Sequence, residues 1–219
     1  MGQEISVVID AVDAIDHQEE KKKQAQDALN ALVTVAKDKA IIHYQTVISN
    51  ARDAKLLPIH HVVTTMQQTY CGISKNPAGL KQSIGDAVKN FVKGEIVDGL
   101  AAIASEALDT LMGSVISNSS EYSNYTITVG QLGGIGRIDF YMYYYKYTSQ
   151  ALITVAEDCL VTSLVVSSAD ISDLDENDIR VIVQSNYSGQ LAGETDAQSN
   201  DRQQNIVKLI TAAIANGKK

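Results

Sequence analysis

The sequence predicts an α+β fold in which long helices pack on a small, mostly antiparallel sheet. Apolar residues recur at helical spacing through the first half of the chain and alternate as in strands in the middle. Helical spacing returns near the end. A chain of 219 residues can bury one sizeable core. We therefore expect one α+β domain that is helical over 5–113, β-rich over 124–167 and helical over 175–216.

The first half of the chain predicts four helical segments. Residues 6–16 form a short amphipathic pattern, and a much longer helix is expected from Glu19 onward. The apolar stripe of this long helix consists of Ala25, Leu29, Leu32, Ala36, Ala40, Tyr44, Val47 and Ala51. Pro58 interrupts the pattern, and we expect further helices over 59–70 and 78–112.

The middle of the chain predicts strands joined by a glycine-rich turn. Residues 125–129 alternate as a strand, and GQLGGIG follows over 130–136. Closely spaced glycines raise the question of a phosphate-binding loop, which would lie between a strand and a helix. These glycines lie between two predicted strands and no Lys-Ser/Thr follows, so a hairpin turn is favoured. Residues 160–166 predict a buried strand.

The end of the chain predicts two helices. Asp175 is placed to cap a helix over 177–187, residues 188–201 look like a polar loop, and 203–215 form an amphipathic closing helix. Asp173, Asp175 and Asn177 have part of the spacing of a calcium-binding loop. However, the sixth position of such a loop is not Gly and the twelfth is not Glu, so we expect a helix start and no metal site.

The most informative stretch is IDFYMYYYKY over 138–147, which holds five of the ten tyrosines in the chain. Strand residues alternate between faces, so Ile138, Phe140, Met142 and Tyr144 share one face. The opposite face carries an acid and a ladder of phenols: Asp139, Tyr141, Tyr143, Tyr145 and Tyr147. Phenols suit contacts that are partly apolar and partly wet. We therefore predict an interface here, either with the protein's own helices or with another chain or ligand, with Asp139 as an acceptor for a phenol.

Charge and motifs exclude several functions. The net charge is −8, and residues 120–201 carry 12 acids against three bases, which argues against nucleic-acid binding. No run is apolar enough to span a membrane and no signal peptide begins the chain, so we expect a cytoplasmic protein. The histidines His17, His43, His60 and His61 lack zinc-site spacing, and no nucleophile motif occurs. We expect neither an enzyme nor a bound cofactor or metal.

The two cysteines, Cys71 and Cys159, are expected to be free thiols and not an intramolecular disulfide. Cys71 is expected at a helix end and Cys159 in a buried stretch. The alternative is a disulfide that locks chains or layers together.

Three functions remain open on this evidence. The leading hypothesis is a non-enzymatic structural protein that self-associates into a homo-oligomer or larger assembly through the tyrosine face. The acidic middle and a basic tail (Arg202, Lys208, Lys218, Lys219) would favour head-to-tail contact. The first alternative is a membrane-active, pore-forming toxin that uses amphipathic helices over 78–112. The second is a carbohydrate- or small-ligand-binding module.

Overall fold

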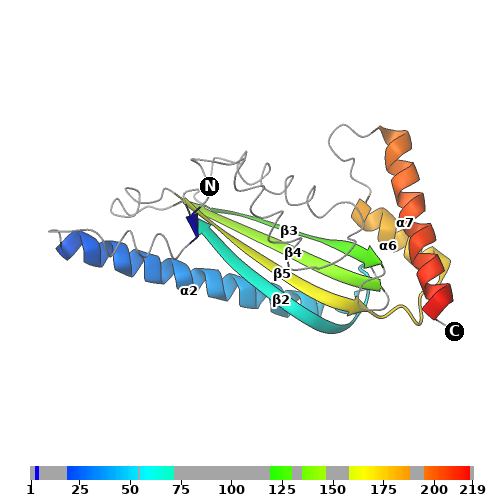
Figure 1. The fold of residues 1–219 in the computed structure, drawn as a ribbon, viewed down its shortest axis with the longest axis horizontal. Helices are drawn as coiled ribbons and strands as arrows, with labels where there is room; N and C mark the ends of the chain where they lie inside the picture. The colour runs from blue at the N-terminus through cyan, green and yellow to red at the C-terminus, as the bar shows by residue number, and fades with distance from the viewer. Residues whose placement is uncertain are drawn as a thin grey trace.

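The computed structural model describes residues 3–4, 19–53, 55–71, 119–129, 135–146, 158–187 and 195–217. Within these ranges the fold is α+β, as the sequence predicts. One long helix runs along a face of an antiparallel sheet, and two further helices stand at one end of that sheet (Figure 1). The predicted segments over 6–16 and 78–112 lie outside the described residues.

The sheet has the strand order β1-β2-β5-β4-β3, and every neighbouring pair is antiparallel. Its long strands are β2 (Ile59–Cys71), β3 (Ser119–Val129), β4 (Ile135–Lys146) and β5 (Asp158–Ala169). The two-residue strand β1 (Gln3–Glu4) pairs with the last two residues of β2. β3 and β4 are consecutive antiparallel neighbours whose pairing ends at Val129 and Ile135, which confirms the predicted hairpin.

Helix α2 (Glu19–Ser49) confirms the long N-terminal helix, and its buried stripe packs inward at steps of three, four or seven residues. The stripe differs from the prediction in two places: the helix ends at Ser49, before Ala51, and one turn presents a different residue to the core. His43 is buried there, whereas Tyr44 is 41 % exposed. The reason is a polar partner, because Ser163 on β5 lies within hydrogen-bond distance of the His43 ring. The spacing of apolar residues alone does not predict such a polar contact.

The predicted helix over 59–70 is wrong, because these residues form β2. The segment contains consecutive β-branched residues, Val62 to Thr65, which favour extended backbone. Ten of its residues pair with β5, and these tertiary hydrogen bonds outweigh the weak helical spacing of its apolar residues.

Helices α6 (Glu176–Tyr187) and α7 (Asp196–Gly217) confirm the helical end of the chain. α7 begins earlier than predicted, because residues 196–201 belong to the helix and not to a polar loop. A capping box explains this start: Thr195 Oγ1 accepts from the Gln198 amide, and Gln198 Oε1 accepts from the Thr195 amide.

The two C-terminal helices bury their apolar faces against the end of the sheet. Their core also includes residues from β3, β4 and the segment before β2. Its fully packed members are Leu57, Tyr125, Ile127, Ile135, Ile179, Ile182, Val183, Ile206, Val207, Ile210 and Ile214.

Asp175 caps α6 as predicted, and this cap can be tested. Its Oδ1 accepts from the Asp178 amide at 2.8 Å, and Asp178 Oδ2 accepts from the Asp175 amide at 3.0 Å. Asp175→Ala removes one half of this reciprocal cap, and we expect a loss of about 1 kcal/mol in the free energy of unfolding. Urea denaturation measures it. Asp173→Ala, at an exposed position two residues earlier, is the control and should cost much less. Equal losses would contradict the capping role.

Candidate functional site

The tyrosine-rich strand β4 lies in the interior of the sheet, between β3 and β5. Its side chains alternate as predicted. Ile138, Phe140 and Met142 are completely buried on one face. The other face, which we call the tyrosine face, carries Asp139, Tyr141, Tyr143 and Tyr145, whereas Tyr147 lies outside the described residues.

Helix α2 covers the tyrosine face over Tyr141 and Tyr143. Ala36 packs against both rings and Val161, and its small side chain lets the helix approach the sheet closely. The His43 ring stacks on Tyr141 with centroids 5.3 Å apart. Lys39 Nζ lies 4.6 Å from the centre of the Tyr143 ring and pairs with Glu121 on β3. The sequence left open whether the tyrosine face contacts the protein's own helices or another chain or ligand. Tyr141 and Tyr143 contact the protein's own helix.

His43 joins α2 to the centre of the sheet. Its Nδ1 lies 2.9 Å from Ser163 Oγ, and both side chains are buried. Burial, reinforced by the positive charge of Arg137, lowers the pKa of His43 to about 4. The ring is therefore neutral at pH 7. A neutral His beside a Ser is the pairing that general-base catalysis uses. Here the pair lies beneath a helix, and it serves to anchor that helix.

Asp139 and Arg137 form a buried ion pair at the start of β4. Arg137 donates from Nε and Nη2 to Asp139 Oδ1 at 2.9 and 2.5 Å. The observed partner of Asp139 is thus a guanidinium, and its role as an acceptor for a phenol stays a prediction. Burial raises the pKa of Asp139, while the Arg137 charge and hydrogen bonds oppose that rise.

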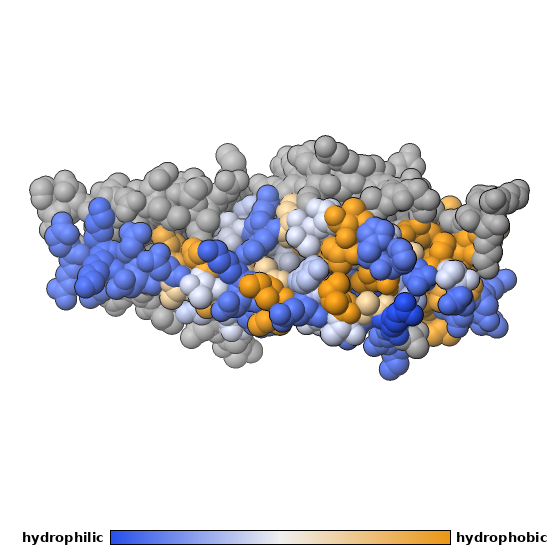
Figure 2. Space-filling model, turned by 90° about the horizontal axis from the view of Figure 1, so that it is seen from below, coloured by the Kyte–Doolittle hydropathy of each residue, from blue (hydrophilic) through white to orange (hydrophobic). Residues whose placement is uncertain are grey.

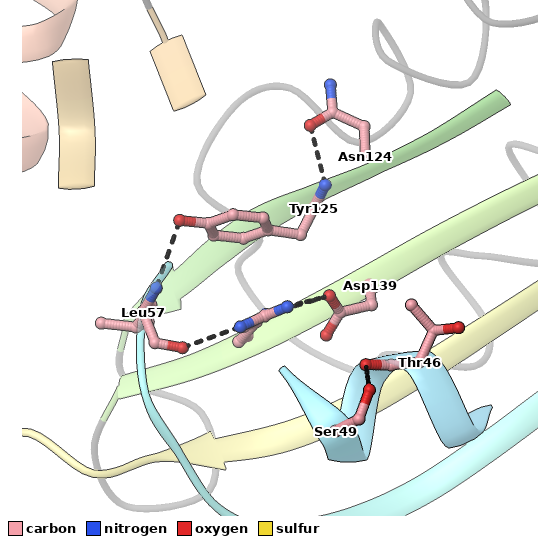
Figure 3. Close-up of polar contacts among 7 residues, drawn as sticks. Thr46, Ser49, Leu57, Asn124, Tyr125 and Asp139 are labelled. Atoms are coloured by element: carbon pink, nitrogen blue, oxygen red, sulfur yellow. Dashed lines mark hydrogen bonds and ion pairs between the residues drawn. The ribbon is translucent and has the colours of Figure 1, made fainter. Parts of the chain in front are cut away.

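Arg137 also ties three segments together. Its guanidinium lies 4.5 Å from the centre of the Tyr125 ring, and Nη1 donates to the Leu57 carbonyl at 3.0 Å. The Leu57 amide donates to the Tyr125 hydroxyl at 3.3 Å. Figure 3 shows Leu57, Tyr125 and Asp139 around the guanidinium. This cluster fixes the chain just before β2 against β3 and β4.

A groove opens beside this polar layer, between α2 and β2. It has a volume of about 640 Å³. Its α2 wall is partly apolar, with Ile41 54 % exposed and Tyr44 41 % exposed. The groove is lined by Ala40, Ile41, Tyr44, Gln45, Val62, Thr64, Thr65, Met66, Gln67, Ser163 and Val165. Sequence reasoning missed this surface because it assigned residues 59–70 to a helix.

The outer side of strand β2 has few neighbours among the described strands. Among the described strands, only the two residues of β1 pair with β2 on the side away from β5, and they reach Tyr70 and Cys71 alone. Thr64, Thr65 and Gln67 are exposed. The strand contains no Lys, Arg, Asp, Glu or Pro, which are the residues that proteins use to protect sheet edges.

The remaining predicted sites have structural roles where they are described. His61 Nδ1 lies 2.9 Å from Ser168 Oγ across β2 and β5. Asp175 caps α6. Within the described ranges, no group of three or more His, Cys, Asp or Glu side chains could hold a metal ion. No helix in that same part of the chain is long and apolar enough to cross a membrane.

Comparison of the chain with protein-family models, curated proteins and solved structures finds no match. The function is therefore argued from the site alone.

Burial of neutral His43 predicts a pH-dependent stability. The pKa of His43 is about 4 in the folded state and about 6.5 in the unfolded state, so the unfolded chain binds more protons between these values. Stability should fall by up to roughly 3 kcal/mol as the pH drops from about 6.5 to about 4. His43→Gln removes this pH-dependent contribution to stability but retains a side chain that can hydrogen-bond to Ser163. Urea denaturation across this pH range should show that the variant loses less unfolding free energy at acid pH than the wild type. The same pH dependence in both proteins would contradict the role of His43.

The Arg137–Asp139 pair predicts strong coupling. Arg137→Met leaves a buried carboxylate without its guanidinium, and we expect a loss of about 3–5 kcal/mol in the free energy of unfolding. Arg137→Met combined with Asp139→Leu removes both charges and should recover at least half of that loss. Urea denaturation of both single variants and the double variant measures the coupling. If the double variant loses as much unfolding free energy as the two single variants together, the two residues are not coupled and the prediction is contradicted.

Proposed function

We propose that this chain is a non-enzymatic, self-associating protein whose copies pair through the open edge of β2. The observation that carries the proposal is the stretch from Thr64 to Thr69. It is regular, uncharged and exposed along much of its length, and it has no neighbour among the described strands on its outer side. A strand edge of this kind offers backbone hydrogen bonds to another strand.

The limits of the usable edge follow from the register of β2. Irregularities between Ile59 and His61 and between Val62 and Thr64 interrupt its pairing with β5. Such bulges twist an edge and discourage pairing. At the other end, β1 occupies Tyr70 and Cys71. The stretch between these limits, Thr64 to Thr69, is long enough to match an ordinary short strand.

A second copy of this chain is the occupant that the surface favours. If two β2 strands pair antiparallel about a twofold axis, the two sheets become continuous and both α2 helices lie on the same side. The flanks of α2 that wall the two grooves, with exposed Ile41 and Tyr44, then face each other across the seam. Figure 2 shows the face formed by α2, with hydrophilic side chains where the helix begins and hydrophobic ones interspersed farther along. The two apolar flanks would shield each other from water.

This mode differs from contact through the tyrosine ladder. Tyr141 and Tyr143 are 7 % and 8 % exposed beneath α2, so they offer little surface to another chain. The acidic middle and the basic tail do not form this seam, because β2 carries no formal charge and Arg202 and Lys208 lie on α7. A charge-driven assembly weakens with salt, whereas this seam should persist.

The small-ligand alternative would use the same groove. Tyr44 offers an exposed aromatic ring, and Gln45 and Gln67 offer amides along the lining. In that case the isolated protein would be a monomer, so the oligomeric state separates the two functions. The membrane-active alternative rests on residues 78–112, which lie outside the described part of the chain.

A charge placed on the edge should break the assembly. We expect the wild-type protein to sediment as a dimer at low and at moderate salt. Thr65→Lys places two like charges at the seam and should raise the dissociation constant by roughly tenfold or more. Sedimentation velocity over a hundredfold range of protein concentration measures this.

Ser123→Lys is the matched control. Ser123 is exposed on β3, the strand at the opposite end of the sheet order, so this variant should remain dimeric. If both variants become monomers, copies join head to tail through β2 and β3, and the twofold seam is wrong. A monomeric wild-type protein under both salt conditions would overturn self-association itself.

A further inference from the structure

We infer that Cys71 and Cys159 are a cross-strand pair that forms an intramolecular disulfide when the protein meets a small-molecule disulfide such as oxidised glutathione. This inference does not depend on self-association. It rests on the register of the sheet, which places the last residue of β2 directly opposite Cys159 near the start of β5.

The predicted position of Cys71, from which no intramolecular disulfide was expected, is wrong. Cys71 was predicted at a helix end, but it ends β2, and the chain between the cysteines returns so that the two residues are register partners. The structure holds Cys159 as a completely buried thiol.

The backbone geometry of register partners suits a disulfide. Opposite residues of antiparallel strands have Cα atoms about 4.5–5.5 Å apart and share one face of the sheet. A disulfide requires Cα atoms about 4.4–6.8 Å apart. The Cα separation expected for register partners therefore lies within the range that a disulfide requires. The strand ends are also held in place, because β1 pairs with Cys71 on one side and β4 pairs with Cys159 through Tyr145 on the other.

The reaction is an exchange in two balanced steps. Because Cys159 is shielded from solvent, the first step occurs at Cys71. The Cys71 thiolate attacks the oxidant, forms a mixed disulfide and releases one small thiol. The Cys159 thiolate then attacks the Cys71 sulfur and releases the second. The two protons of the protein thiols end on the two small thiols, so the protein is oxidised by two electrons and the oxidant is reduced by two.

Such a bond would close the chain from residue 71 to residue 159 into one covalent loop. This removes conformational freedom from the unfolded chain, and a loop of this length gives a large entropic effect. In the folded state the bond clamps β2 to β5 at the end of the sheet where β1 pairs. The proposed site is thus a covalent clamp whose closure depends on the redox environment.

The test treats the full-length native protein with oxidised glutathione and then titrates its thiols in denaturant. We expect two thiols per chain before treatment and none after it, with an intact mass lower by two hydrogens and no covalent dimer on a non-reducing gel. The melting temperature should rise on the order of 10 °C and return after reduction. Persistence of both thiols, a stable glutathione adduct on the wild type, or a covalent dimer would overturn the proposal.

A register control separates geometry from mere reactivity. Cys71→Ser combined with Thr69→Cys moves the thiol two residues along β2, opposite Val161, where it is diagonal to Cys159. This variant should retain a glutathione adduct and gain no stability. Cys159→Ser should likewise stop at the adduct on Cys71. Ring closure in the shifted variant as fast as in the wild type would mean that the register does not direct the bond.

Discussion

The position of α2 over a polar face of the sheet is the constraint on which the rest of the structure depends. A helix that covers Arg137, Asp139, Ser163 and phenol rings removes water from groups that need hydrogen-bond partners. The protein supplies some of those partners from both layers, whereas the buried atoms His43 Nε2 and Asp139 Oδ2 have no hydrogen-bond partner among the described residues. His43 reaches Ser163, Lys39 reaches Glu121, and Gln67 donates to the Ala36 carbonyl at 3.1 Å. Each contact spans helix and sheet, so together they fix where along the sheet the helix lies and which way it is rotated.

The rotation of α2 in turn creates the exposed surface. Because His43 must face Ser163, its neighbour Tyr44 turns toward the flank above β2, and Ile41 lies one turn earlier on that flank. A helix with only apolar contacts could rotate by a fraction of a turn and bury these side chains. The polar anchors oppose that rotation. The groove therefore accompanies these polar contacts between helix and sheet, and it lies beside β2, whose described residues carry no formal charge.

Sequence reasoning reached the parts of the fold that local periodicity determines. The period of two in β4 separated Ile138, Phe140 and Met142 from the tyrosines, and the cap at Asp175 located α6. It failed for β2, whose apolar residues have spacings that suit a helix as well as a strand. Only pairing with β5, almost one hundred residues away, decides that choice. The same non-local pairing brings Cys71 opposite Cys159, and no local pattern predicts that contact. The Arg137–Asp139 pair is local, because the two residues lie two positions apart on the same face of β4, so the alternation of the strand could have revealed it.

Strand β2 carries both proposals, and its two edges keep them separate. The inner edge is hydrogen-bonded to β5, and this pairing places the cysteines opposite each other. The outer edge, from Thr64 to Thr69, would accept a second copy. A disulfide at the end of the inner edge removes no backbone donor or acceptor from the outer one. By holding β2 against β5 it would instead reduce fraying of the strand that must present a regular edge, so oxidation should favour pairing.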